Sequence, residues 1–161
     1  MSGRTALSLP DAEATQALGR GLARVLRAGD LVVLTGGLGA GKTTLTQGIG
    51  AGLRVRGRVS SPTFIIARVH PSEVGGPDLV HVDAYRLGSL DEVDALDLDT
   101  SLEDSVTVVE WGAGLVEPLA QDRLEVELVR PRGGEGHQGR EAHLRGVGAR
   151  WAQVELTGLL Q

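Results

Sequence analysis

Residues 31–46 contain the feature that most constrains how this chain can fold. An apolar run at 31–34 leads into the glycine-rich stretch G-G-L-G-A-G-K-T at 36–43, and a helix-like segment at 44–53 follows. The spacing of the outer glycines, the lysine and the threonine is the P-loop pattern, in the strand–loop–helix context that the pattern requires. The pattern predicts a phosphate-binding loop at the junction of a strand and a helix.

The residue types of this loop fit a triphosphate. Backbone N–H groups can surround crowded phosphate oxygens only where no Cβ intrudes and the chain can adopt unusual φ and ψ angles, as glycine permits. The start of the next helix adds N–H donors and a partial positive charge. Lys42 can reach the β- and γ-phosphates, and the Thr43 hydroxyl suits Mg²⁺, which prefers oxygen ligands. We therefore expect a nucleotide to be bound by Gly37, Leu38, Gly39, Ala40, Gly41, Lys42, Thr43 and Thr44.

Composition limits the class of protein. With 161 residues the chain is expected to form one domain, residues 1–161, and its core must be aliphatic because aromatic residues make up only 2%. No apolar run approaches the length of a membrane span, and the first residues lack the apolar core of a signal peptide. The chain has no cysteine, which excludes disulfides and thiolate metal sites. These features predict a cytoplasmic protein without a membrane segment.

Negative charge is concentrated in the middle of the chain. Residues 71–127 contain 15 acidic residues and only two basic ones, Arg86 and Arg123, for a net charge of −13. Extensive contact between this block and RNA or DNA is not expected, because phosphate contacts need cations. The block is interpreted either as a solvated acidic face or as a surface for a basic partner.

Apolar periodicity predicts the elements around the P-loop. A helix is expected from Pro10-Asp11 to about Arg27, since proline suits the first turn of a helix. The run at 31–34 is typical of a central parallel strand, and the segments at 123–130 and 141–147 indicate an antiparallel hairpin. The other expected elements are strands at 5–9, 64–69, 79–83 and 106–110, and a closing helix at 149–160.

Two of the expected strands end in a carboxylate. Asp83 ends the strand at 79–83, which is the Walker B type of arrangement, with an acid near Mg²⁺ and the attacking water. Glu110 ends the strand at 106–110, and the carboxyl ends of parallel strands meet at one edge of a sheet. We expect both acids at the edge that carries the P-loop. His81 shares a strand face with Asp83 and is interpreted as a hydrogen-bonded strand histidine rather than a ligand.

Two further positions have two interpretations each. Ser61-Pro62-Thr63 is a rigid turn after the P-loop helix. A hydroxyl there either binds Mg²⁺ or phosphate when the triphosphate is present, or belongs to a plain strand-entry turn. Trp111 either covers the site or fills the edge of the core.

Four landmarks, in this order and spacing, carry a resemblance to a known family. They are the P-loop at 36–43, S-P-T-F at 61–64, H-V-D-A-Y-R-L at 81–87 and E-W-G at 110–112. Together they resemble the bacterial TsaE family, formerly YjeE, the ATPase of tRNA threonylcarbamoyladenosine synthesis. The P-loop alone is generic, whereas the other three together are specific. The likeness covers most of the chain, from Pro10-Asp11 through the last expected hairpin.

The resemblance implies a P-loop NTPase fold of the α/β class, with a mainly parallel central sheet flanked by helices and with antiparallel edge strands. It also implies that the protein binds ATP and Mg²⁺, hydrolyses ATP slowly and works with two partners, TsaB and TsaD. In that system TsaD transfers threonylcarbamoyl to the adenosine beside the anticodon of tRNA. The ATPase resets or regulates the complex and meets tRNA indirectly.

The resemblance further implies roles for single residues. Lys42 would hold the phosphates, Thr43 and Glu110 would ligate Mg²⁺, and Asp83 would support hydrolysis close to the metal. Thr63 would sense the γ-phosphate. The candidate catalytic residues are therefore Lys42, Thr63, Asp83 and Glu110.

Two nucleotide contacts and the expected rate complete this prediction. Thr15, on the first expected helix, would approach the adenine, and Trp111 is the second candidate nucleotide contact. The sequence shows no obvious intrinsic arginine finger, so turnover is expected to be slow until a partner orders the switch turn or supplies a charge.

Three alternatives remain beside the ATPase. A GTPase would need an Asn-Lys-x-Asp motif, but the chain has no asparagine and its one lysine, Lys42, is in the P-loop. A small-molecule kinase usually has arginines that clamp the acceptor, and the three arginines of residues 54–58 are the candidates. A non-hydrolysing nucleotide-binding regulator would bind ATP without turnover.

Overall fold

The computed structural model describes residues 4–36, 41–55, 67–83, 104–110, 122–129, 139–156 and 158–159. Its helices are α1 (Ala12–Val25), α2 (Lys42–Leu53) and the short 3-10 helix η3 (Ala149–Trp151). Its strands are β1 (Arg4–Leu9), β2 (Leu31–Gly36), β3 (Ala67–His70), β4 (Asp78–Asp83), β5 (Ser105–Glu110), β6 (Arg123–Val129) and β7 (Arg140–Val147). Within these described residues, no helix is long and apolar enough to cross a membrane.

The strands form one seven-stranded sheet in the order β1-β7-β6-β2-β5-β4-β3. The four central strands, β6, β2, β5 and β4, run parallel to one another. Strands β1, β7 and β3 make antiparallel pairs at the two sides of the sheet. The prediction of a mixed α/β fold with a parallel centre and antiparallel edge strands is therefore confirmed. The sheet is parallel over its four central strands and antiparallel at its three outer strands.

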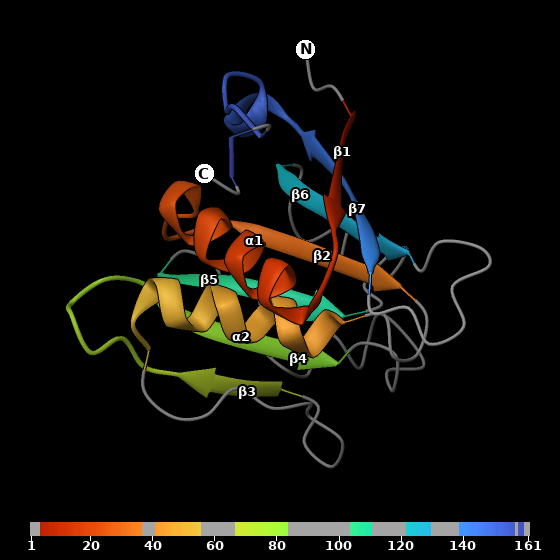
Figure 1. The fold of residues 1–161 in the computed structure, drawn as a ribbon. Helices are drawn as coiled ribbons and strands as arrows, with labels where there is room; N and C mark the ends of the chain where they lie inside the picture. Colours follow the sequence, from red (N-terminus) through yellow and green to blue (C-terminus); the bar gives the residue numbers. More distant parts are fainter. Residues whose placement is uncertain are drawn as a thin grey trace.

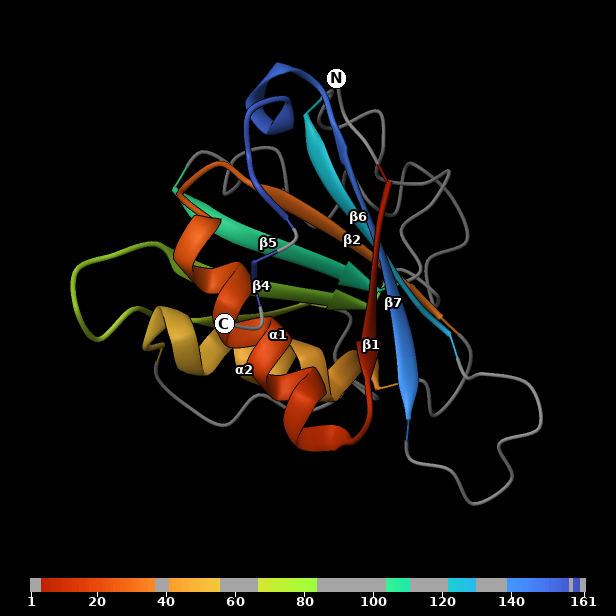
Figure 2. The ribbon, with the colours of Figure 1, turned by 45° about the horizontal axis from the view of Figure 1, so that its top comes forward.

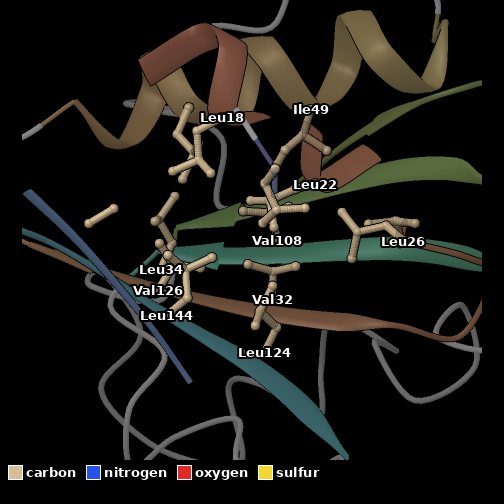
Figure 3. Close-up of a cluster of buried hydrophobic side chains, with 14 of the residues drawn as sticks. Leu18, Leu22, Leu26, Val32, Leu34, Ile49, Val108, Leu124, Val126 and Leu144 are labelled. Atoms are coloured by element: carbon tan, nitrogen blue, oxygen red, sulfur yellow. The ribbon is translucent and has the colours of Figure 1, made fainter. Parts of the chain in front are cut away.

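Helices α1 and α2 lie on the same face of the sheet (Figures 1 and 2). Figure 3 shows the side chains that fill the layer between them and the strands, among them Leu22 of α1, Ile49 of α2 and Val108 of β5. All three are 0% exposed. Burial of one aliphatic side chain of this size contributes about 1.5–3 kcal/mol, so this layer holds both helices on the sheet.

Glycines allow α1 and α2 to pack at backbone distance. A Cβ placed on Gly48 of α2 would overlap the carbonyl oxygen of Gln16 in α1. A Cβ placed on Gly19 of α1 would lie 2.7 Å from the backbone nitrogen of Ile49 in α2. Helix α1 therefore fixes the position of the helix that follows the P-loop.

The prediction of a closing helix at 149–160 is wrong. Among the described residues of this range, only η3 is helical. Trp151 instead packs against Gly146 and is 2% exposed. Further along, a Cβ placed on Gly21 of α1 would overlap the carbonyl oxygen of Leu159, so the tail lies directly on α1. Helix propensity is a weak preference, and these tertiary contacts override it.

Arg150 in η3 anchors this tail to the residue that precedes β2. Its guanidinium donates two hydrogen bonds of 3.0 Å to the two carboxylate oxygens of Asp30 and one of 2.6 Å to the Val25 carbonyl oxygen. The side chains of Asp30 and Arg150 are only 5% and 13% exposed. A bidentate pair this buried depends on both partners, because removal of one leaves a charge with little access to water.

We expect Arg150→Ala to lower the free energy of unfolding by about 3 kcal/mol, because Asp30 would stay buried without its partner. Arg145→Ala is the control. Arg145 lies 3.5 Å from Glu125 but is 58% exposed, and loss of an exposed pair costs less than about 1 kcal/mol. Urea unfolding of the wild type and both variants measures the difference. Equal losses in the two variants would show that Arg150 is not an anchor.

Candidate nucleotide-binding site

The carboxyl ends of the parallel strands form one edge of the sheet, and α2 begins at that edge (Figure 1). Strand β2 ends at Gly36, and α2 starts at Lys42. The register pairs Asp83 of β4 with Glu110 of β5, and Glu110 with Leu34 of β2. The prediction that two strands end in acids at the P-loop edge is confirmed by this register.

The N-terminus of α2 has the features of an anion site. Its N-cap residue, Gly41, has a φ of 103°, a left-handed conformation that glycine adopts at little cost. In the described part of the chain, no side chain accepts a hydrogen bond as the cap of this helix. In the described first turn of α2, no residue is acidic. Helix α1 is the opposite case, because Asp11 accepts a hydrogen bond of 2.8 Å from the Ala14 backbone nitrogen. An uncapped helix start with its positive dipole end favours a phosphate group.

Lys42 connects the two ends of the P-loop. Its Nζ donates a hydrogen bond of 2.9 Å to the carbonyl oxygen of Gly36, the last residue of β2. The ammonium therefore lies where the chain leaves the sheet. A phosphate oxygen is a stronger, charge-assisted acceptor than a carbonyl oxygen. A phosphate group at the start of α2 can thus replace this carbonyl oxygen as an acceptor for Nζ.

Three threonines lie around the start of α2. Thr43 and Thr44 are half-buried in its first turn. Thr15 of α1 is 2% exposed, and its methyl carbon would lie 3.8 Å from a Cβ placed on Gly41. Its hydroxyl donates a hydrogen bond of 3.4 Å to the Asp11 carbonyl oxygen. Thr15 therefore packs beside the end of the P-loop, and its contact with adenine stays a prediction.

Glu110 is a buried carboxylate at this edge. It is 5% exposed, and its Oε2 lies 3.4 Å from Nε2 of His81, which is 0% exposed. Asp83 is at the same level of the sheet, and only its backbone is described. His81 lies in strand β4, as predicted, but the expected hydrogen bond is not seen here: neither ring nitrogen has a hydrogen-bond partner among the described residues.

Sequence reasoning also missed an arginine at this edge. Arg140 falls between the two segments of the expected hairpin, 123–130 and 141–147, but it begins β7, which runs antiparallel to β6. Its backbone therefore lies near the end of β6, one step beyond the pair of Val129 and Glu141. Its Nη1 donates a hydrogen bond of 2.8 Å to the adjacent Gly139 carbonyl oxygen.

Several predicted site residues lie outside the described part of the chain, and their roles stay predictions. They are Gly37, Leu38, Gly39, Ala40, Thr63 and Trp111. Arg54 is described: it is exposed and follows the last turn of α2, at the end opposite Lys42.

The oxygen atoms at this edge suit Mg²⁺. Thr43 supplies a hydroxyl in the first turn of α2, and Glu110 supplies a buried carboxylate. Asp83 is the register partner of Glu110 on the neighbouring strand. Among the described residues, no three metal-binding side chains form a cluster by themselves. Mg²⁺ does not require such a cluster, because it is usually held by one or two carboxylates and takes its other ligands from substrate phosphates and water.

The family of the chain follows from comparison with known proteins. A family model described as threonylcarbamoyl adenosine biosynthesis protein TsaE matches residues 9–139, a range that includes all four landmarks. The chain belongs to the TsaE family. A TsaE relative from Streptomyces coelicolor, named tRNA threonylcarbamoyladenosine biosynthesis protein TsaE, is 61% identical over 88% of this chain and 97% of its own length. A relative of the same name from Mycobacterium tuberculosis is 51% identical over 81% of this chain and 82% of its own.

A solved structure agrees with this TsaE assignment. The crystal structure of Bacillus subtilis YdiB matches this chain with a TM-score of 0.72 and 30% sequence identity. The match covers 94% of this chain and 90% of YdiB. The family resemblance inferred from the four landmarks is therefore confirmed.

Proposed function

We propose that this TsaE chain is a P-loop ATPase that binds ATP with Mg²⁺, hydrolyses it slowly and supports threonylcarbamoyl transfer to the adenosine next to the anticodon of tRNA. One arrangement carries the proposal: the uncapped start of α2, the Lys42 ammonium and the buried Glu110 carboxylate share one edge of the sheet. The relatives, which are named for threonylcarbamoyladenosine biosynthesis, support the biological setting.

The proposed reaction is an in-line attack of water on the γ-phosphorus, with ADP as the leaving group. Lys42 and the N–H groups of the loop and of α2 offset the charge of the transferring phosphoryl group. Asp83 orients the attacking water, and Thr63 contacts the γ-phosphate. Mg²⁺, held by Thr43, Glu110 and Asp83, supplies positive charge at the phosphate oxygens when it is bound.

We test the roles of the two acids with Glu110→Gln and Asp83→Asn, which keep side-chain shape and remove the charge. Each variant is expected to lower ATP turnover by about 10²-fold, because Glu110→Gln removes a charged Mg²⁺ ligand and Asp83→Asn removes the carboxylate that orients the attacking water. Glu125→Gln is the control, because Glu125 pairs with Arg123 at 3.0 Å on β6. ADP release measures turnover, and calorimetry measures ATP binding. If both site variants hydrolysed ATP at the wild-type rate, the catalytic assignments would fail.

The same assay tests the partners. We propose TsaB- and TsaD-type proteins as partners, with tRNA reached through their complex, and ATP turnover is measured as the complex and then tRNA are added. Stimulation by the complex supports the proposal. Equal turnover with and without it would count against partner stimulation. ATP binding with no turnover under any condition would instead indicate the non-hydrolysing regulator.

The position of Arg54 argues against its use as the acceptor clamp that the small-molecule kinase alternative requires. Arg54 follows the last residue of α2, a helix of 12 residues that is about 18 Å long. Lys42 is at the other end of that helix. A guanidinium so far from the start of α2 cannot hold an acceptor against the transferred phosphate.

A further inference from the structure

His81 of β4 is a buried polar side chain to which the proposed reaction gives no role. It is 0% exposed, and among the described residues neither Nδ1 nor Nε2 has a hydrogen-bond partner. Its neighbours on this face include Leu79, two residues earlier on β4, and Val108, its register partner on β5, both of them also 0% exposed. Burial of an imidazole without hydrogen bonds costs stability, so a packing role alone would favour an apolar residue here.

One charged group lies close to the ring. Nε2 of His81 is 3.4 Å from Oε2 of Glu110 on the neighbouring strand. The register explains this approach: His81 pairs with Val108, so Glu110 follows two residues later on the same face of β5. The distance is longer than an N–H···O hydrogen bond, which spans about 2.7–3.2 Å. A shift on the order of a few tenths of an ångström, with the N–H turned toward the carboxylate oxygen, would form the bond.

We propose that His81 is a positioning residue for Glu110, an inference that rests on the proposed ATPase function. The ring donates a hydrogen bond from Nε2–H to one carboxylate oxygen of Glu110. The bond shortens when nucleotide and Mg²⁺ are bound, as hydrogen bonds in active sites often do. The donation sets the plane of the carboxylate and leaves its other oxygen for the metal. Outer hydrogen bonds of this kind orient ligands in metal sites and tune them.

Three substitutions in the full chain separate positioning from packing. His81→Leu fills the space and removes the donor. His81→Gln places an amide nitrogen close to where Nε2 lies, whereas His81→Asn places it close to Nδ1. For each protein we measure kcat, the KM for ATP, the Mg²⁺ concentration that gives half-maximal turnover, and the melting temperature.

Positioning predicts a specific pattern. His81→Leu lowers kcat by about 10–100-fold and raises the Mg²⁺ requirement, while the KM for ATP changes by less than about twofold. His81→Gln recovers most of the loss, and His81→Asn does not. Wild-type kcat and Mg²⁺ dependence in His81→Leu would overturn the inference, as would equal losses in the Gln and Asn variants. If His81→Leu does not fold, the comparison of Gln with Asn decides.

The tautomer of His81 gives a readout that does not depend on activity. Imidazole ¹⁵N spectra show which ring nitrogen carries the proton, and the chain has only four histidines. We expect a proton on Nε2, and we expect Glu110→Gln to shift the Nε2 signal. His143, whose Nε2 lies 2.9 Å from Glu141, is the control that stays unchanged. An Nε2 without a proton in the wild type would overturn the inference.

Failure of this inference is distinguishable from failure of the proposed function. If the proposed function is wrong, the wild type does not hydrolyse ATP, whether or not it binds the nucleotide. If only the role of His81 is wrong, wild-type binding and turnover stay intact while the substitutions or the tautomer depart from the expected pattern.

Discussion

Lys42→Ala is expected to lower ATP turnover by about 10²–10³-fold, the loss typical of removing one preorganised donor from an anion-stabilising site. Its Nζ lies 2.9 Å from the Gly36 carbonyl oxygen, where β2 enters the P-loop, and the chain has no second lysine. ATP affinity should fall as well, because the phosphates would lose the ammonium and be held by Mg²⁺, the N–H groups and the dipole of α2 without it. ADP release measures turnover, and calorimetry measures affinity.

Two further variants test whether the loss of turnover is specific to the ammonium group of Lys42. Arg54→Ala removes one positive charge at the opposite end of α2, where Arg54 is exposed, and it is expected to keep wild-type turnover. Lys42→Arg keeps the charge but replaces a compact ammonium with a planar guanidinium, and it is expected to be as slow as Lys42→Ala. A wild-type rate in Lys42→Ala, or an equal loss in Arg54→Ala, would contradict a phosphate-binding role for Lys42.

Gly48→Val is expected to destabilise the fold by about 3 kcal/mol, at the upper end of the usual cost of overpacking. A Cβ on Gly48 would overlap the carbonyl oxygen of Gln16 and lie 3.0 Å from its Cα. These are backbone atoms of α1, so the contact can be relieved only by moving one helix away from the other. The gain in helix propensity on replacing glycine is below about 1 kcal/mol and does not offset this. Thermal unfolding should show a melting temperature lower by about 6–12 °C.

Gly158→Val is the matched control for this prediction. A Cβ at Gly158 meets no atom within 4 Å, so the same substitution should leave the melting temperature close to that of the wild type. Because α2 carries Lys42 and Thr43, Gly48→Val should also weaken ATP binding at temperatures where the variant is folded. A melting temperature for Gly48→Val equal to that of Gly158→Val would show that the two helices do not depend on glycine contact.

The parts of the fold that could be predicted are those with local signals. The apolar run before the P-loop predicted β2, the alternation at 123–130 and 141–147 predicted the β6–β7 pair, and Pro10-Asp11 predicted the start of α1. The shared edge of Asp83 and Glu110 could be predicted because parallel strands end at the same side of a sheet.

The parts that could not be predicted depend on contacts between distant segments. The pairing of Arg150 with Asp30 and the packing of Trp151 on Gly146 replace the expected closing helix, and 120 residues separate the partners of the first contact. The approach of His81 to Glu110 depends on the register between β4 and β5, which no local pattern specifies. The period-two spacing of His81 and Asp83 was the only sequence signal for it.

The most direct test of the proposed nucleotide site is a crystal structure of this chain with Mg²⁺ and a non-hydrolysable ATP analogue. We predict the triphosphate at the start of α2, with Lys42 Nζ moved from the Gly36 carbonyl oxygen to a phosphate oxygen. We also predict the metal between the triphosphate, Thr43 and Glu110. A nucleotide bound elsewhere, or none bound while the bond between Lys42 and Gly36 stays intact, would contradict the proposed site.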